Sequence, residues 1–229
     1  MAISEKTDKQ LLLSSMKFPL FLVVILWIIK IYEIIFNLDL HTFGIFPQKL
    51  SSLHGIITSP LVHSGMKHLV SNTGPLFILC AGVFYFYRKI AFKIFTLTYL
   101  ITGLLVWIAA REAYHIGASG LIYGFAAFLF TSGILRKDIR LSAVSLVVVF
   151  LYGGMIWGIL PLKPHVSWES HLLGLVVGVV LAIFYRKQPA YTTVPDWNDE
   201  EIMDSTEEDI NFKYYYSEED EEENSSSNI

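Results

Sequence analysis

Ser119 and His171 are of the residue types that could act as a nucleophile and its base. Ser119 lies in the stretch HIGASGLIYG, residues 115–124, and His171 lies in SHLLGLVVG, three residues before Gly174. A neutral imidazole beside a serine hydroxyl can take the hydroxyl proton during attack and return it to a leaving group. Each residue also has a structural interpretation, because a serine can bond a backbone carbonyl and a histidine can bridge two helices. Their chemistry therefore depends on whether the two side chains meet.

Small residues give these two segments a reason to pack together. Gly174 and Gly178 form a GxxxG face close to the side of the helix that bears the histidine. On the serine segment, Gly120 and Gly124 form a similar face. Such faces let two helix backbones approach closely, so we expect the segments to be in contact. The residue two after the serine is Leu121, so the GxSxG elbow of soluble α/β-hydrolases is absent.

A further group of polar residues lies in HSGMKHLVSN, residues 63–72. His68 and Asn72 are four apart, so they share one face of a helix, and both can donate hydrogen bonds to an oxyanion. The spacing also resembles a helical pair of metal ligands, but HExxH is absent and no Asp or Glu accompanies the pair in its apolar run. We place oxyanion donors ahead of zinc ligands. For His63 we expect a hydrogen bond that anchors the preceding loop.

The rest of the sequence indicates an integral membrane protein. Of its 229 residues, 53% are hydrophobic and only 17% are charged. The single cysteine, Cys80, lies in an apolar run, so an intramolecular disulfide is excluded. Six apolar runs are long enough to cross about 30 Å of hydrocarbon, and each must do so as a helix. These runs are 18–36, 68–87, 91–110, 117–135, 141–160 and 168–185.

The basic residues set the orientation that we expect for these spans. Lys and Arg gather before the first span and after the second, fourth and sixth, and they are sparse on the opposite side. The positive-inside rule therefore places both termini in the cytoplasm. All 7 histidines then fall on the outer side or at the outer ends of spans. Because polar groups inside a membrane are costly and mark function, the outer half of the bundle is predicted to hold the site.

Composition divides the chain into a cytoplasmic segment 1–17, a membrane domain 18–187 and a tail 188–229. The tail is rich in Asp and Glu and ends EEDEEENSSSNI, so it cannot bury a core and is predicted to be a disordered cytoplasmic tail. Between the first two spans, Asn37–Lys67 is semi-apolar and broken by Gly and Pro. We expect it to form a structured loop that is partly embedded in the outer leaflet.

Three motifs in order resemble those of the rhomboid family of intramembrane serine proteases. HxxxN lies on the second predicted span, GxSG opens the fourth, and HxxGxxxG lies on the sixth. Each motif alone is weak, but the three together with the matching topology are specific. The resemblance covers residues 18–187 and implies an all-α integral membrane fold, a six-transmembrane-helix rhomboid-like bundle with both termini in the cytoplasm.

The resemblance also implies a catalytic dyad and an oxyanion hole. Ser119 matches the family's nucleophile, and His171 matches the residue that acts as general base and then as general acid. His68, Asn72 and the backbone N–H of Ser119 match the donors of the oxyanion hole. No metal or organic cofactor is implied.

Three further residues match supporting positions of the family, and one region departs from it. Tyr123 matches a tyrosine that packs against the imidazole, and Gly117 matches the small residue that leaves room for the substrate carbonyl. His63 matches a loop histidine that some members have. Many members carry a Trp-Arg pair in the first loop, where this sequence reads Leu53-His54-Gly55. The departure concerns the conformation of the loop more than catalysis.

Charged residues near the spans have structural interpretations. Lys30 and Glu33 are three apart in the first span, so they can pair on one helix face. Glu169 lies two residues before the histidine and hence on a different helix face, so we interpret it as an interfacial carboxylate. Arg111 and Glu112 have the same interpretation.

The sequence thus predicts an intramembrane serine endopeptidase that cleaves transmembrane segments of client membrane proteins. Its partners would be these substrates and the lipid bilayer, with no nucleic acid. The location would be the plasma (inner) membrane, with the active site towards the extracytoplasmic side. One alternative is a catalytically silent rhomboid-like protein that binds membrane helices. The other is a His-rich metal-dependent membrane hydrolase, which chelators would inactivate and which would tolerate Ser119→Ala.

Overall fold

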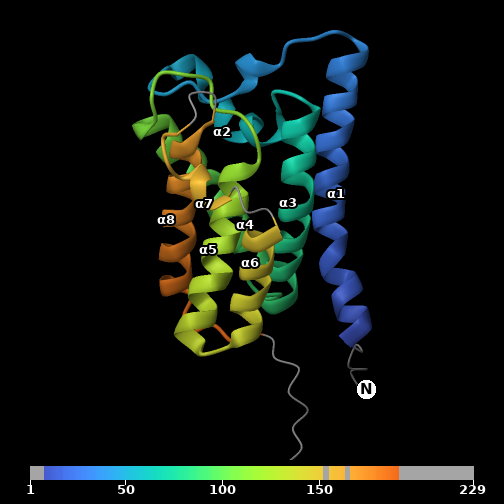
Figure 1. The fold of residues 1–229 in the computed structure, drawn as a ribbon, viewed down its shortest axis with the longest axis vertical. Helices are drawn as coiled ribbons and strands as arrows, with labels where there is room; N and C mark the ends of the chain where they lie inside the picture. Colours follow the sequence, from blue (N-terminus) through green and yellow to red (C-terminus); the bar gives the residue numbers. More distant parts are fainter. Residues whose placement is uncertain (1–7, 152–154, 163–165, 191–229) are drawn as a thin grey trace, which may run out of the picture. The chain divides into compact units, whose positions relative to one another are not determined.

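The computed structural model describes residues 8–151, 155–162 and 166–190 of the chain. These residues form helices joined by short loops, and within them the only strand-like pairing is an isolated bridge between Ile45 and His115. Most of the predicted tail 188–229 lies outside the described residues. The helices, shown in Figure 1, are α1 Asp8–Ile35, η1 His41–Phe43, η2 Leu50–Ser52, α2 Gly55–Thr58, η3 Ser59–Leu61, α3 Met66–Phe86, α4 Ala91–Ala109, α5 Ser119–Arg136, α6 Ile139–Leu151, α7 Met155–Gly158 and α8 Trp168–Phe184.

Four described helices are long and apolar enough to cross a membrane, namely α1, α3, α4 and α5. A fifth, α8, is apolar and has 17 residues, which is the lower end of the length that a span requires. The fold is therefore an all-helical membrane bundle, as predicted. The count of six spans and the orientation of the termini stay predictions.

Two predicted boundaries differ from the observed helices. The first helix begins at Asp8, ten residues before the predicted start at 18, because the polar N-terminal residues continue the helix of the span. The predicted fifth span, 141–160, is not one described helix. α6 has 13 residues and a length of about 20 Å, and α7 has only 4. Residues 152–154, between them, lie outside the described residues, so a single fifth span stays a prediction.

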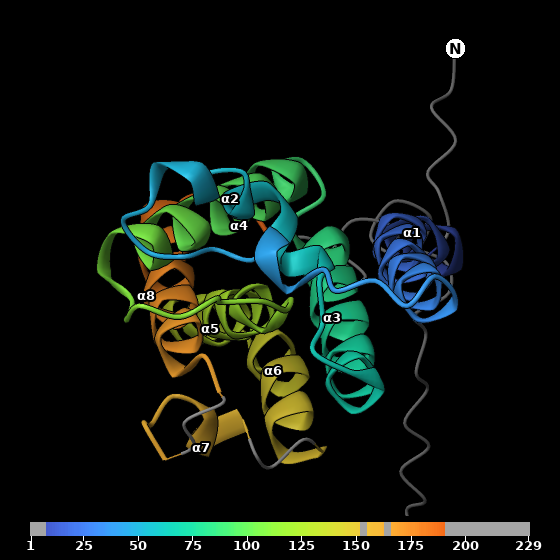
Figure 2. The same cartoon turned by 90° about the horizontal axis from the view of Figure 1, so that it is seen from above.

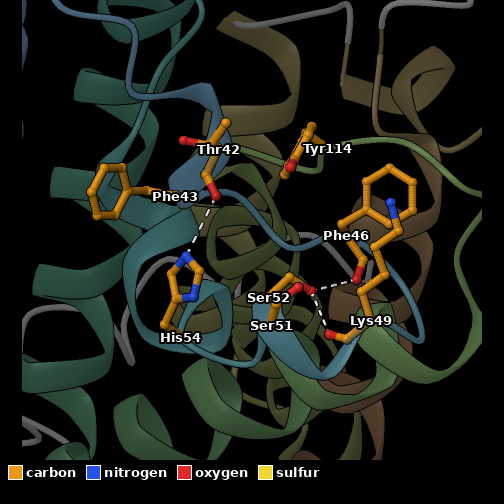
Figure 3. A pocket seen from close by; sticks show the side chains of 8 residues that line it. All are labelled: Thr42, Phe43, Phe46, Lys49, Ser51, Ser52, His54 and Tyr114. Carbon is orange, nitrogen blue, oxygen red and sulfur yellow. Dashed lines mark hydrogen bonds between the residues drawn. The ribbon is translucent and has the colours of Figure 1, made fainter.

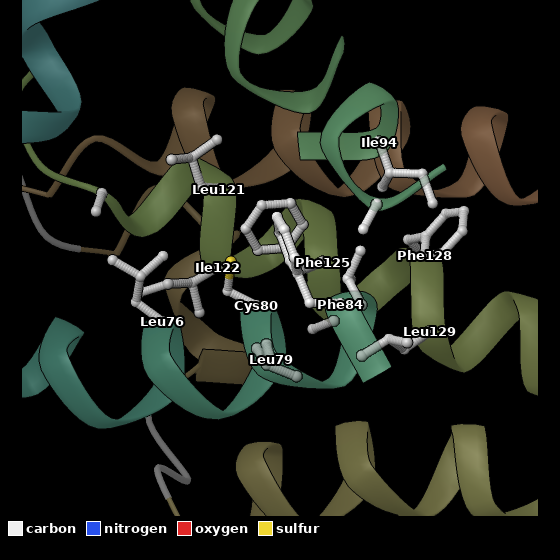
Figure 4. Close-up of a cluster of buried hydrophobic side chains, with 14 of the residues drawn as sticks. Leu76, Leu79, Cys80, Phe84, Ile94, Leu121, Ile122, Phe125, Phe128 and Leu129 are labelled. Carbon is white, nitrogen blue, oxygen red and sulfur yellow. The ribbon is translucent and has the colours of Figure 1, made fainter. Parts of the chain in front are cut away.

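α5 lies at the centre of the bundle, with α3, α4, α6 and α8 around it (Figure 2). Its side chains are mostly buried, whereas α1 and α4 expose apolar residues. Figure 4 shows the cluster of buried side chains that α5 shares with α3 and α4. Cys80 lies within this cluster and is buried, in agreement with an apolar packing role. The labelled members of the cluster are Leu76, Leu79, Cys80, Phe84, Ile94, Leu121, Ile122, Phe125, Phe128 and Leu129.

α5 and α8 touch through their glycines. A Cβ added at Gly174 would collide with the Gly120 carbonyl oxygen, and a Cβ added at Gly178 would collide with the Gly124 carbonyl oxygen. The two backbones are therefore in direct contact. Because lipid offers no hydrophobic driving force between helices, this close packing is a main source of their association.

α1 packs on α3 at the edge of the bundle and carries the predicted ion pair (Figure 1). Lys30 Nζ lies 2.8 Å from Glu33 Oε2, so the two side chains pair as expected. Lys30 also donates a hydrogen bond of 2.9 Å to the backbone carbonyl of His63. A second tie joins Trp27 Nε1 to Thr73 Oγ1 at 3.1 Å. The pair therefore links α1 to the loop that leads into α3.

The glycine contact predicts that Gly174→Ala destabilises the protein. An added methyl group forces α8 away from α5, and such overpacking costs about 2 kcal/mol. The thermal midpoint of the purified protein in detergent should fall by several degrees. Gly65→Ala is the matched control, because an added Cβ there meets none of the described atoms within 4 Å. Equal thermal midpoints for the two variants would contradict the direct backbone contact.

Candidate active site

Ser119 and His171 are in hydrogen-bond contact at the N-terminal ends of α5 and α8. Ser119 is the first residue of α5, and His171 lies in the first turn of α8. His171 Nε2 is 2.7 Å from Ser119 Oγ, and both side chains are buried. The structure thus brings together the two residues that the sequence places in the dyad.

The other ring nitrogen of His171 fixes which tautomer is present. His171 Nδ1 is 2.7 Å from the backbone carbonyl of Gly158, the last residue of α7. A carbonyl can only accept, so Nδ1 carries the proton and Nε2 is left to accept from the Ser119 hydroxyl. This tautomer is the one that a general base requires.

Sequence reasoning did not identify Gly158 as part of the site. A backbone carbonyl leaves no side-chain signature, and residue 158 was expected inside the fifth span. The last carbonyls of a helix lack intrahelical partners, so the end of α7 is free to accept this bond. A Cβ at Gly158 would collide with Tyr123 Oη and lie 3.1 Å from His171 Nδ1.

Tyr123 supports the imidazole from one side. It lies one helical turn after Ser119, and its ring stacks on the His171 ring with centroids 4.4 Å apart and an angle of 13° between planes. The stacked ring limits rotation of the imidazole about its side-chain bonds. The family's expected contact between tyrosine and histidine is therefore present in the geometry.

His68 and Asn72 face the backbone of Gly117. A Cβ at Gly117 would lie 2.7 Å from His68 Nε2 and 3.5 Å from Asn72 Nδ2, and its φ of 105° disfavours any other residue. His68 Nδ1 is 3.2 Å from Ser64 Oγ, so it can accept from that hydroxyl and leave Nε2–H as a donor. Asn72 Nδ2 is buried without a hydrogen-bond partner among the described residues. Two donors are thus available beside the small residue that precedes the serine.

His63 differs from the expectation of a loop-anchoring hydrogen bond. Neither of its ring nitrogens has a hydrogen-bond partner within the part of the chain that the structure describes. Its ring instead packs edge-on against His68, with centroids 5.0 Å apart, and its backbone carbonyl accepts from Lys30. Burial, with a smaller contribution from the nearby His68, lowers the pKa of His63 to about 3. His63 is therefore neutral at physiological pH.

One cavity of about 1160 Å³ joins these groups. Its volume is slightly above the range of small-molecule sites, about 300–1,000 Å³, so it can admit an extended peptide segment. Both polar and apolar side chains line it. The lining includes His68, Asn72, Ser119, Tyr123, Gly158 and His171.

The loop between α1 and α3 is structured, as predicted, and encloses a separate cavity of about 340 Å³ (Figure 3). In the region that lacks the Trp-Arg pair, His54 is exposed and its Nε2 lies 3.4 Å from the Thr42 carbonyl. Ser52 Oγ donates to the Phe46 carbonyl at 2.5 Å. Hydrogen bonds to backbone carbonyls therefore hold this loop. Its cavity is lined by Thr42, Phe43, Phe46, Lys49, Ser51, Ser52, His54 and Tyr114.

Glu169 pairs with Arg111, and its predicted place at the membrane interface stays a prediction. It is buried, with 7% of its surface exposed, and its Oε1 lies 3.5 Å from Arg111 Nε. Arg111 belongs to the loop before α5 and also donates to the Val166 carbonyl just before α8. Glu112, in contrast, is exposed as expected. Among the described residues, no group of three or more His, Cys, Asp or Glu side chains is placed to hold a metal ion.

Comparison with known proteins shows similarity over more than half of the chain. The family model described as "Rhomboid domain" matches residues 50–188. Uncharacterised proteins of Mycobacterium bovis and Mycobacterium tuberculosis are 34% identical over 174 residues, which cover 70% of this chain and 70% of each relative. An uncharacterised protein of Mycobacterium leprae is 31% identical over 172 residues, covering 69% of this chain and 66% of that protein.

The buried, neutral His63 predicts a defined dependence of stability on pH. The unfolded chain takes up a proton near the ordinary pKa of 6.5, whereas the folded chain does not until about 3. Stability is therefore complete above pH 6.5 and is lost as the pH falls. This residue alone lowers the free energy of unfolding by about 1.4 kcal/mol per pH unit in that window.

The measurement is the thermal midpoint of wild type and His63→Leu at about pH 7 and about pH 5. The variant should lose part of the acid-induced decrease, because leucine cannot take up a proton. His54→Leu, at an exposed position, should keep the full decrease. An unchanged decrease in His63→Leu would show that the histidine is protonated in the folded state.

Proposed function

Because the chain belongs to the rhomboid family and is an integral membrane protein, we propose that it is an intramembrane serine endopeptidase with Ser119 and His171 as its catalytic dyad. The observation that carries the proposal is the 2.7 Å contact from Ser119 Oγ to His171 Nε2. The Gly158 carbonyl supports it by holding the imidazole in the tautomer that accepts a proton. The relatives are themselves uncharacterised, so the chemistry of the dyad is argued from this geometry.

The reaction would begin with attack of Ser119 Oγ on a peptide carbonyl. His171 Nε2 takes the hydroxyl proton and then gives it to the leaving amine, which yields an acyl-enzyme. A water molecule then attacks the acyl carbon with His171 again as base. The proton held at Nδ1 stays with the Gly158 carbonyl, which stabilises the imidazolium that forms at each step.

The oxyanion would be held by His68, Asn72 and the backbone N–H of Ser119. Ser119 opens α5, and the first N–H groups of a helix have no intrahelical acceptor and lie at its positive end. The unpartnered amide of Asn72 supports the same assignment, since a buried donor without an acceptor is costly in the resting protein. The oxyanion that forms in the transition state would accept a hydrogen bond from Asn72 Nδ2.

The substrate would be a transmembrane segment of a client protein, cut at the extracytoplasmic side of the plasma membrane. The carbonyls of a helix are tied to amides four residues on, so the client must unwind before its carbonyl reaches Ser119. We expect helix-breaking residues near the cut, and a small residue just before it. The polar lining of the cavity supports entry of the water that deacylation needs.

Substitution of the dyad gives the direct test of this proposal. In proteoliposomes with a single-span reporter substrate, Ser119→Ala and His171→Ala should each lower cleavage by a factor of about 1000 or more. Ser132→Ala, a buried serine on the same helix, and His54→Ala are the matched controls and should cleave at the wild-type rate. Normal cleavage by Ser119→Ala would exclude the serine mechanism.

The oxyanion assignment predicts a loss that is confined to the chemical step. Asn72→Ala should lower kcat by about 100-fold or more with little change in KM, because the donor acts on charge that exists only in the transition state. Asn72→Asp should be at least as damaging, since a carboxylate repels the oxyanion. Thr73→Ala is the matched control, because that hydroxyl faces α1. A rise in KM at constant kcat would instead indicate a role in substrate binding.

A further inference from the structure

A second pair of side chains joins the same two segments just outside the dyad. His115 Nδ1 lies 2.5 Å from Ser167 Oγ, and His115 is almost fully buried. His115 is four residues before Ser119, and Ser167 is four residues before His171. Both hydrogen bonds therefore join residues 52 apart in the chain. They form two successive ties between the entrance to α5 and the entrance to α8.

The hydrogen bonds around His115 define a neutral ring. His115 Nε2 is 3.0 Å from the Arg111 carbonyl, so this nitrogen carries the proton and Nδ1 accepts from the Ser167 hydroxyl. Ser167 in turn accepts from Ser170 Oγ at 2.7 Å. Burial lowers the pKa of His115, while the facing charges of Arg111 and Glu169 have opposite effects on it. The ring is thus a fixed acceptor for Ser167.

The backbone of His115 is held independently of its side chain. Its N–H donates to the Ile45 carbonyl at 2.8 Å, and its carbonyl accepts from the Ile45 N–H at 3.0 Å. Gly117, two residues on, donates to the Ser59 carbonyl at 2.8 Å. The segment before Ser119 is therefore anchored to the loop between α1 and α3. The imidazole extends this anchored segment to α8.

The Ser167 side chain bonds His115 and makes no hydrogen bond to the backbone of its own helix. It occupies the N-cap of α8, where a serine normally bonds an N–H of its own first turn and contributes about 1 kcal/mol. In the described structure its side chain makes no such cap bond. Its hydroxyl donates a hydrogen bond to His115 Nδ1 instead. The start of α8 is thus tied to a neighbouring segment rather than to its own backbone.

We propose that His115 is a positioning residue that holds the first turn of α8, and with it His171, at hydrogen-bond distance from Ser119. The inference rests on the proposed function for its effect on catalysis. The glycine contact holds the α8 backbone from Ser170 onward, because a Cβ at Gly120 would lie 3.2 Å from the Ser170 carbonyl oxygen, but it does not hold the residues before α8. Near that end Arg111 provides a further tie, since it donates to the Val166 carbonyl at 2.9 Å.

The His115 and Ser167 pair is not arranged as a second nucleophile and base. The Ser167 hydroxyl both donates to His115 and accepts from Ser170, and the unpartnered donor of the site, Asn72 Nδ2, lies beside Gly117 instead. A positioning role uses every one of these bonds. It also explains why a buried histidine stands four residues before the nucleophile.

Kinetics of the full-length protein in proteoliposomes test the catalytic consequence. His115→Ala should lower kcat for a single-span reporter by about 10- to 100-fold with little change in KM, because a small displacement of His171 misaligns proton transfer. Ser167→Ala should have a similar effect, and the double variant should be no worse than either single one. Ser167→Thr, which keeps the hydroxyl, should restore most of kcat. His54→Ala is the control histidine.

Hydrogen–deuterium exchange tests the positioning itself and does not require activity. Amides of residues 168–173 should exchange faster in His115→Ala than in wild type and His54→Ala, while the rest of α8 stays unchanged. Unchanged exchange there, or a wild-type kcat in His115→Ala, would overturn the proposal. An inactive wild type that still shows the local change in exchange would instead contradict the proposed function and leave His115 as the tie between the segments.

Discussion

The direct backbone contact between α5 and α8 is the constraint on which the rest of the site depends. Gly174 and Gly178 lie against the carbonyls of Gly120 and Gly124, so the two helices can only sit at the distance that these glycines set. Both helices begin at the same end of the bundle. The contact therefore brings their first residues together, and Ser119 meets a histidine of the first turn of α8 there.

Polar groups buried in the interior of this protein lower its stability where they lack hydrogen-bond partners. Asn72 Nδ2 and Glu169 Oε2 are buried without hydrogen-bond partners among the described residues, and each such group costs about 1–3 kcal/mol. Asn72 lines the cavity that contains Ser119. The unpartnered donor beside Ser119 lowers the stability of the resting protein, and it fits the proposed oxyanion hole, in which the transition state would satisfy that donor.

Sequence patterns were sufficient for side chains whose partners lie on regular helices. Helical spacing and glycine faces placed Ser119 opposite the histidine of α8, and a separation of four placed His68 beside Asn72. They failed where the partner is a backbone group or an irregular loop. The Gly158 carbonyl has no side-chain pattern, and the burial of Glu169 beside Arg111 depends on the path of the loop before α5.

In the function that we propose, the contact between α5 and α8 makes Ser119 a nucleophile through His171. Treatment of the purified protein with a fluorophosphonate, followed by peptide mass spectrometry, locates the reactive serine directly. We expect an adduct on Ser119 in wild type and in Ser167→Ala, and none on Ser119 in His171→Ala. An adduct on Ser167 with Ser119 unmodified, or an unmodified wild-type protein, would contradict it.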